Sequence, residues 1–479
     1  MWSERTARNV RWLPFCIPPL FLAAILTLQP VGHFVPPVDD TPGYFLPEGY
    51  SRLLFDDSDN VAWMIRAENA RRGRRAGRVD EAGKPVQPKP AKLHADYEAL
   101  VAARPPFSER YFLEYPPLAL AFFRIGHLAT ASDGTAAISA TLLDGHEFNF
   151  TCHLPTDEAE RQFYRGIRRG VVASTVLLML ALLGVMVLTR RGIGPNGIAS
   201  GSPWLCVLPA MLYFTACRYD ILPAGLVLLC LACTARARPS WGALALGVAI
   251  AFKLYPLILA PLILRYAFRS WRQTGAWCAC CALPSLFANG VMVLTDGWQS
   301  VVVPFQFQFG RTVEPLFILY DRLLSLELAT GPYSSLFRNG SVLALVAILC
   351  YRKPPNVESL LRRCALAVML FAALQVFYSP QWWLWFAVLL IPLTRTHRGL
   401  TALIVLTDAV TYATFPLAFD RIVIGSFDDD QITRVSDNLT KIRGLLWMGI
   451  AGVLVWAEVR GRKGEQTVST VGSPPDRLL

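Results

Sequence analysis

The chain has 479 residues, of which 53% are hydrophobic and only 17% are charged, and its mean hydropathy is +0.38. In soluble proteins about a quarter of all residues are charged, so this composition excludes an ordinary soluble domain and indicates that the chain is surrounded by a lipid bilayer. The formal net charge of +11 does not point to nucleic-acid binding, because the cytoplasmic loops of membrane proteins collect Lys and Arg during insertion.

Several uncharged runs match the ~20 residues that are needed to cross a hydrocarbon core. A single signal sequence cannot account for several such runs, which cover residues 171–189, 273–295 and 364–394. We therefore expect an all-α, polytopic bundle of about twelve transmembrane helices. The expected spans lie near residues 13–35, 112–130, 170–189, 203–217, 220–235, 241–264, 274–295, 336–351, 364–378, 382–394, 399–419 and 443–459.

The basic residues predict which connections lie in the cytoplasm. Three arginines within residues 1–12 precede the first span, so the N-terminus is expected inside. Other basic connections then fall inside as well, at 165–169, 265–272, 352–363, 395–398 and 460–463. Three basic groups fall outside in this arrangement, namely Arg190 with Arg191, Arg236 with Arg238, and the cluster at 71–78.

These assignments divide the chain into parts. Residues 1–12 are expected in the cytoplasm, residues 13–459 form the transmembrane domain, and the polar residues 460–479 form a disordered cytoplasmic tail. The first external loop, residues 36–110, is long and has proline-rich ends. Helical spacing over 59–72 predicts a helix in that loop that lies in the membrane interface.

The cysteines and histidines predict neither a disulfide framework nor a metal site. Most of the 11 cysteines lie inside apolar runs, where they behave as small hydrophobic residues. No pair of them has the context of a metal ligand set, and the six histidines are scattered. We expect no metal and no cofactor.

An acidic patch follows the first span, formed by Asp56, Asp57 and Asp59. A sugar that is transferred with inversion needs one carboxylate that takes the proton from the attacking hydroxyl. These residues are therefore candidates for the catalytic base. The alternative is a helix N-cap, because Asp57 or Asp59 suits the start of the helix that follows.

Two further motifs lie on the predicted external side. Tyr115 precedes two prolines, and proline is tolerated in the first turn of a helix, which explains this motif without any ligand. Arg311 and Glu314 are spaced so that their side chains can form an ion pair, or leave Arg311 to bind a phosphate. Tyr115, Arg311 and Glu314 are candidate substrate-binding residues.

The external turn within residues 364–394 has the sequence Ser379-Pro380-Gln381-Trp382-Trp383. Aromatic rings at a membrane boundary can stack on a sugar face, and Ser379 and Gln381 are candidates for hydrogen bonds to the substrate. Anchoring in the interface explains the two tryptophans equally well.

Lys253 is the conspicuous charge inside an expected span. A buried lysine costs about 2.5–3.5 kcal/mol on insertion scales and marks a candidate functional site. Snorkelling of the side chain to the interface is the alternative. Arg218 and Asp220, between two short apolar runs, compensate either each other or Lys253.

The order of these motifs resembles glycosyltransferase family 87, over roughly residues 50–395. The resemblance rests on the acidic patch at 56–59, Tyr115-Pro-Pro, Arg218-Tyr-Asp-Ile-Leu-Pro223, Lys253-Leu-Tyr-Pro256, Arg311-x-x-Glu314 and Ser379-Pro-Gln381 followed by an aromatic residue. No single motif is specific, but their order is.

The resemblance implies a fold of the GT-C superfamily and an inverting transfer from a polyprenyl-phosphate sugar, often mannose. It implies a lipid or glycan acceptor outside the cytoplasm and a multi-pass protein of the plasma membrane. Asp59 best matches the family's loop-one aspartate, with Asp56 and Asp57 as alternatives. The donor phosphate would meet Arg311 or a loop-one arginine such as Arg71, and this chemistry requires no metal.

Two other classes of protein fit the same composition. A transporter or flippase of a lipid-linked precursor also needs charges inside the membrane and a basic vestibule. Against this alternative, the sequence shows no repeated halves, and its long loop follows only the first span. A structural or assembly subunit without catalytic activity is the other alternative.

Overall fold

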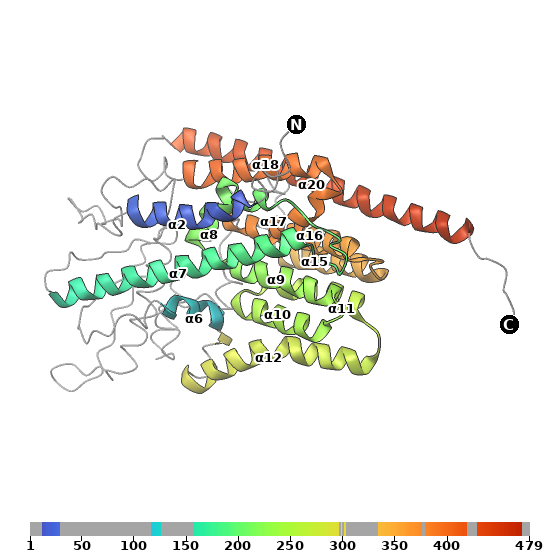
Figure 1. The fold of residues 1–479 in the computed structure, drawn as a ribbon, viewed down its shortest axis with the longest axis horizontal. Coiled ribbons are helices and arrows are strands. Elements are labelled where there is room, and N and C mark those ends of the chain that lie inside the picture. The colour runs from blue at the N-terminus through green and yellow to red at the C-terminus, as the bar shows by residue number, and fades with distance from the viewer. Residues whose placement is uncertain are drawn as a thin grey trace.

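The computed structural model describes residues 12–28, 116–125, 158–296, 298, 301–302, 334–375, 379–418 and 429–471. Every regular element within these ranges is a helix, which confirms the all-α prediction for this part of the chain. The longer helices lie side by side along the long axis of the molecule (Figure 1).

The α-helices differ widely in length. They are α2 (Ile17–Leu28), α6 (Pro117–Ile125), α7 (Glu158–Arg191), α8 (Pro209–Cys217), α9 (Ile221–Ala235), α10 (Pro239–Phe252), α11 (Ala260–Ala267), α12 (Trp271–Asp296), α15 (Ser334–Tyr351), α16 (Val357–Ala373), α17 (Trp383–Leu390), α18 (Arg398–Tyr412) and α20 (Asp429–Val471). Short helical segments join several of them: η1 (Leu13–Cys16), η3 (Pro203–Val207), η4 (Tyr255–Leu259), η7 (Pro380–Trp382), η8 (Ile391–Arg395) and η9 (Ala413–Ala418).

Three helices of the described part are long and apolar enough to cross a membrane, over Val172–Arg191, Trp271–Leu294 and Asn438–Arg460. The bent pair of α8 and α9, with an angle of 110°, adds a fourth candidate. The prediction of about twelve spans is therefore not confirmed. Several expected spans are short apolar helices instead, because prolines such as Pro209 and Pro239 start new helices within the apolar sequence.

The sequence predicted three spans over residues 203–264, but this part of the chain folds into two hairpins. The first hairpin comprises η3, α8 and α9, and it starts and ends near the C-terminus of α7. Gly201 N donates to Thr189 O at 3.1 Å, and Arg236 Nη2 donates to Gly192 O at 2.9 Å. The second comprises α10, η4 and α11, and its two ends, at Pro239 and Ala267, line one cavity.

Basic residues gather at the end of the molecule where both hairpins begin and end. Arg236 Nη1 donates to Ile193 O at 2.6 Å, and Arg395 Nη1 donates to Ser200 Oγ at 3.1 Å. Lys353 Nζ lies 3.4 Å from Phe268 O. We call this region, formed by residues 190–202, 234–240, 265–272, 351–358 and 395–398, the basic end. Figure 1 shows α7 ending and α12 beginning on this side.

This gathering corrects the predicted topology. Arg190, Arg191, Arg236 and Arg238 were expected on the side opposite to the groups at 265–272 and 395–398, and the structure places all of them at one end. Hydropathy alone does not reveal that an apolar segment turns back inside the bilayer.

The direction of α7 is also opposite to the prediction. This helix is continuous over 34 residues, which corresponds to about 51 Å at 1.5 Å per residue. Since Arg190 lies at the basic end, residues 165–169 lie toward the other end, not with the other basic connections as predicted.

Impermeant labelling tests this arrangement. Ser240 lies in the first turn of α10 and Ser270 lies before α12, and both side chains are exposed. We expect single Ser240→Cys and Ser270→Cys variants to react with an impermeant maleimide from the same side of sealed vesicles, above the labelling of the parent chain. Labelling of the two positions from opposite sides would contradict the hairpins and restore the topology predicted from sequence.

A buried ionic cluster fastens α20 to α16 near the basic end. Glu458 accepts hydrogen bonds from Ser359 Oγ at 2.8 Å, from Arg362 Nε at 3.2 Å and from Arg363 Nη2 at 2.8 Å. Arg363 is 1% exposed and also donates to Leu349 O, so it links α15 to the pair. Burial of these charges is tolerated because each has a hydrogen-bonded partner.

Candidate functional site

The tips of the two hairpins meet inside the bundle through a pair of opposite charges. Lys253 Nζ lies 2.5 Å from Asp220 Oδ1. Asp220 precedes α9, and Lys253 follows α10 in an extended conformation, with φ −156° and ψ 144°. Their side chains are 1% and 14% exposed, so the pair is withdrawn from solvent at the break of each hairpin.

A tryptophan from a third helix completes the pair. Trp385 Nε1 of α17 donates to the same Asp220 Oδ1 at 2.5 Å. The indole is sandwiched between Tyr255, with ring centroids 4.2 Å apart, and Trp382, with centroids 4.7 Å apart. We call these residues, with Tyr219, the Asp220 cluster: Tyr219, Asp220, Lys253, Tyr255, Trp382 and Trp385.

The rings also surround the ammonium group of Lys253. Its Nζ lies 5.0 Å from the ring centroid of Tyr219 and 5.1 Å from that of Trp385. Cations within about 6 Å of an aromatic face are stabilised by the ring quadrupole. Lys253 is thus held by one carboxylate and two aromatic faces, which excludes the alternative that it snorkels to the interface.

Charge balance limits what the Asp220 cluster does chemically. Asp220 and Lys253 neutralise each other, and one buried charge without the other is strongly unfavourable. The Asp220 carboxylate is almost fully buried and already accepts two hydrogen bonds on one oxygen. We infer that Asp220 fixes the position of Lys253 and is not the base that deprotonates an acceptor.

The helix that follows Tyr115-Pro116-Pro117 packs against this cluster. Phe122 of α6 lies 6.0 Å from Tyr219 between ring centroids. Tyr115 itself lies outside the described residues. The structure therefore brings four of the sequence motifs to one place: α6, the Arg218–Asp220 break, the Lys253 break and the turn before α17.

The predicted site residues fall into two groups. Lys253 lies in the Asp220 cluster, and Ser379 and Gln381 are half-buried where η7 begins. The other candidates lie outside the residues that the structure describes: Asp56, Asp57, Asp59, Arg71, Tyr115, Arg311 and Glu314. Their roles stay predictions.

Neither tryptophan of the Ser379 turn serves as an exposed platform. Trp382 is 5% exposed and Trp383 is 0% exposed, so neither stacks on a sugar or anchors in the interface, as the sequence had suggested. Trp383 Nε1 donates to Asp408 Oδ1 at 2.9 Å, and Trp382 stacks on Trp385. Both belong to the core, since the indole N–H of Trp383 and the ring face of Trp382 find partners inside the bundle.

Asp408 is a buried carboxylate that the sequence reasoning missed. This residue of α18 accepts from Ala210 N at 2.9 Å and Met211 N at 3.1 Å, in addition to Trp383. It caps the N-terminus of α8 from a distant helix, where first-turn amides lack intrahelical partners. Its signal was present, because a single acid inside an apolar run always requires a partner.

The part of the chain that the structure describes contains no group of three or more His, Cys, Asp and Glu side chains arranged for a metal ion. All ten cysteines in these ranges are free. Half of them are buried in the core as apolar side chains, namely Cys206, Cys217, Cys230, Cys281 and Cys364.

Comparison with known proteins now adds a family. No curated protein matches the chain. Residues 167–380 match the model of glycosyltransferase family 87, and this segment includes Tyr219, Asp220, Lys253 and Tyr255. The match confirms the resemblance found in the order of the motifs. Together with the apolar helices, it indicates a membrane glycosyltransferase, and over residues 167–380 the chain is similar to glycosyltransferase family 87.

Proposed function

We propose that the protein transfers a sugar from a polyprenyl-phosphate donor to a lipid or glycan acceptor outside the cytoplasm. The sugar is mannose or another hexose or pentose, and its anomeric configuration is inverted. The observation that carries this proposal is the family match over residues 167–380, which indicates a glycosyltransferase. The polyprenyl-phosphate donor follows from the resemblance of the ordered motifs to that family.

The distribution of charge supports an external active face. By the positive-inside rule, the basic end lies on the cytoplasmic side of a plasma membrane. α2 begins at this end, because Trp12 stacks on Arg190 with 3.5 Å from Cζ to the ring centroid. Both α2 and α12 run away from it (Figure 1). The loops with Asp59 and Arg311 therefore follow helices that end on the opposite, external side.

The proposed reaction is a single displacement. Asp59 takes the proton from the acceptor hydroxyl as its oxygen attacks C1 of the sugar, and the bond from C1 to the phosphate oxygen breaks. One displacement inverts C1. Arg311 or Arg71 stabilises the charge on the departing polyprenyl phosphate. An Asp has an ordinary pKa near ~3.9, so partial desolvation would make Asp59 a stronger base.

Lys253 has a different role in this proposal from that of the arginines. Asp220 already balances its charge, so Lys253 adds no net positive charge for a phosphate. We propose that it shapes the wall of the donor site, together with Ser379 and Gln381 in the turn before α17. Arg311, with Glu314 beside it, then supplies the anion-binding charge.

Purified protein in nanodiscs tests the proposal with two donors of the same sugar. We expect radiolabelled mannose to pass to an acceptor lipid extract from polyprenyl-phosphate mannose and not from a nucleotide-linked mannose. The rate should persist in a metal chelator, since the leaving group carries only one phosphate. Transfer from the nucleotide sugar alone would exclude the proposed donor, and transbilayer movement of the donor without product would favour a flippase.

A further inference from the structure

A hollow with polar walls lies at the basic end, away from the Asp220 cluster. It has a volume of about 280 Å³ and lies where three helix connections meet. The hairpin junction contributes residues 234–239, the end of α11 contributes residues 266–269, and the turn before α16 contributes residues 353–355. We call this hollow the basic pocket.

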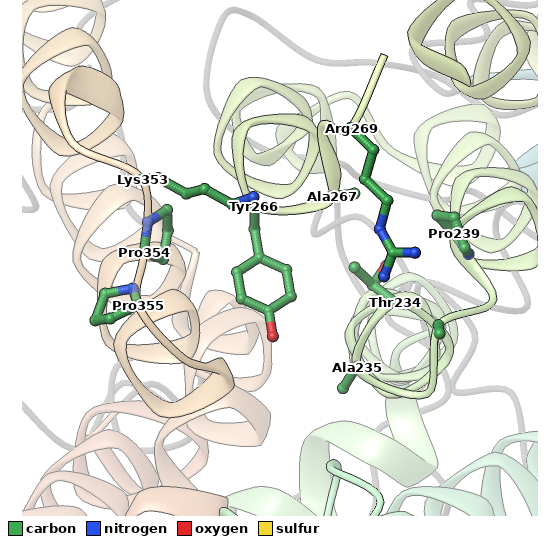
Figure 2. Close-up of a pocket in the computed structure, with 10 residues that line it drawn as sticks. Thr234, Ala235, Pro239, Tyr266, Ala267, Arg269, Lys353, Pro354 and Pro355 are labelled. Atoms are coloured by element: carbon green, nitrogen blue, oxygen red, sulfur yellow. The ribbon is translucent and has the colours of Figure 1, made fainter. Parts of the chain in front are cut away.

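Two cations face the basic pocket and no acid does. Figure 2 shows Lys353 and Arg269 on opposite sides of Tyr266. None of the ten residues that line the pocket is acidic. Within the described residues, Arg269 makes no ion pair, and Lys353 makes only a long contact of 3.4 Å to Phe268 O.

The rule that basic residues collect in cytoplasmic loops explains how many cations lie at this end, but not why two of them line one hollow without a carboxylate. Three other cations nearby have hydrogen-bonded partners. Arg236 donates to three carbonyls, and Arg362 and Arg363 bind Glu458. Arg269 and Lys353 are left with an excess of positive charge that an anion would balance.

The tryptophans of this region indicate its depth in the bilayer. Trp241 and Trp271 are 66% and 82% exposed, and both lie within a few residues of the pocket walls. Exposed tryptophans concentrate at the level of lipid headgroups. An apolar groove of about 360 Å³ also starts at the same hairpin junction, lined by Arg238, Trp241 and leucines of α9 and α10.

We propose that the basic pocket binds a phosphate-bearing ligand on the side of the membrane opposite the proposed catalytic face. Arg269 presents a planar donor fork, and Lys353 presents a point charge on a flexible stem, a combination suited to phosphate oxygens. The volume is near the lower limit of roughly 300 Å³ for ligand pockets, which suits a headgroup-sized ligand. An anionic phospholipid headgroup and a soluble phosphate compound share this chemistry.

Ligand-induced stabilisation of the full chain measures this binding without any sugar transfer. The unfolding midpoint would be followed by tryptophan fluorescence in neutral detergent, with added phosphatidylglycerol, phosphatidylcholine or inorganic phosphate. We expect Arg269→Gln and Lys353→Gln each to weaken the apparent affinity for the stabilising anion about tenfold. Arg272→Gln is the matched control, because Arg272 is exposed one turn away and does not line the pocket.

Each outcome decides between the sources or against the site. Stabilisation by phosphatidylglycerol and not by inorganic phosphate would support the pocket with a lipid headgroup as the ligand. Stabilisation by both would support it with a soluble phosphate group. The proposal fails if phosphatidylcholine stabilises as well as phosphatidylglycerol, if no anion stabilises the wild type, or if Arg272→Gln weakens binding as much as the pocket variants.

Discussion

Asp59→Asn is expected to lower the rate of sugar transfer by about 10²–10⁴-fold, the usual contribution of a general base. Asparagine has nearly the same shape as aspartate but cannot accept the proton of the acceptor hydroxyl. The measurement is the turnover of purified protein with a polyprenyl-phosphate sugar. The unfolding midpoint is measured alongside, to exclude loss of the fold.

Asp56→Asn and Asp57→Asn are matched controls, since both carboxylates lie within three residues of Asp59. We expect each to retain activity within about tenfold of the wild type, well above the loss expected for the base. If Asp57→Asn abolishes transfer and Asp59→Asn does not, the base is Asp57 and Asp59 caps the helix. If all three variants transfer at the wild-type rate, the proposed mechanism is wrong.

Removal of one partner of the buried pair should destabilise the protein strongly. Lys253→Met leaves the Asp220 carboxylate buried without its cation, and the expected loss is about 3–5 kcal/mol of unfolding free energy. Asp220→Leu leaves the ammonium without its carboxylate and should cost a similar amount. Unfolding in detergent, followed by fluorescence, gives both values.

The double variant Lys253→Met with Asp220→Leu separates stability from function. Replacing both charges by apolar groups should recover most of the stability lost in each single variant. If the double variant folds but transfers sugar much more slowly, Lys253 contributes to the substrate site. If it transfers at the wild-type rate, the pair is structural only. A double variant as unstable as the sum of the single variants would show that the two charges do not compensate each other.

Composition and hydropathy predicted the helical class, because uncharged apolar runs of about 20 residues can be read from the sequence alone and indicate membrane-spanning helices. The sequence also singled out Lys253, since a charge inside an apolar run is visible without a structure. The sequence left open whether Asp220 pairs with Lys253 or with its neighbour Arg218. That choice depends on how the hairpin tips meet, since Asp220 and Lys253 lie 33 residues apart in sequence, and on Trp385, which lies 165 residues from Asp220.

Topology was the weaker part of the prediction for a physical reason. Insertion rules read the length of an apolar run and its flanking charges, and they do not read a reversal within the bilayer. The reversal was encoded by charged residues beside prolines, as in Lys253-Leu-Tyr-Pro256, because helices that break inside a membrane expose backbone groups that polar side chains satisfy. Trp382 and Trp383 were misjudged similarly, since burial in a core and location at an interface give the same local pattern.

The hairpin tips have a consequence for biogenesis. The tip of the second hairpin carries Lys253, whose carboxylate partner Asp220 lies on the first hairpin, so the second hairpin alone would bring an unbalanced charge into lipid as it leaves the translocon. Residues 203–267 are therefore best inserted as one four-helix unit whose electrostatic cost cancels only when both halves have been synthesised. The second half follows the first after only a short turn of chain, so Asp220 is already synthesised when Lys253 leaves the translocon.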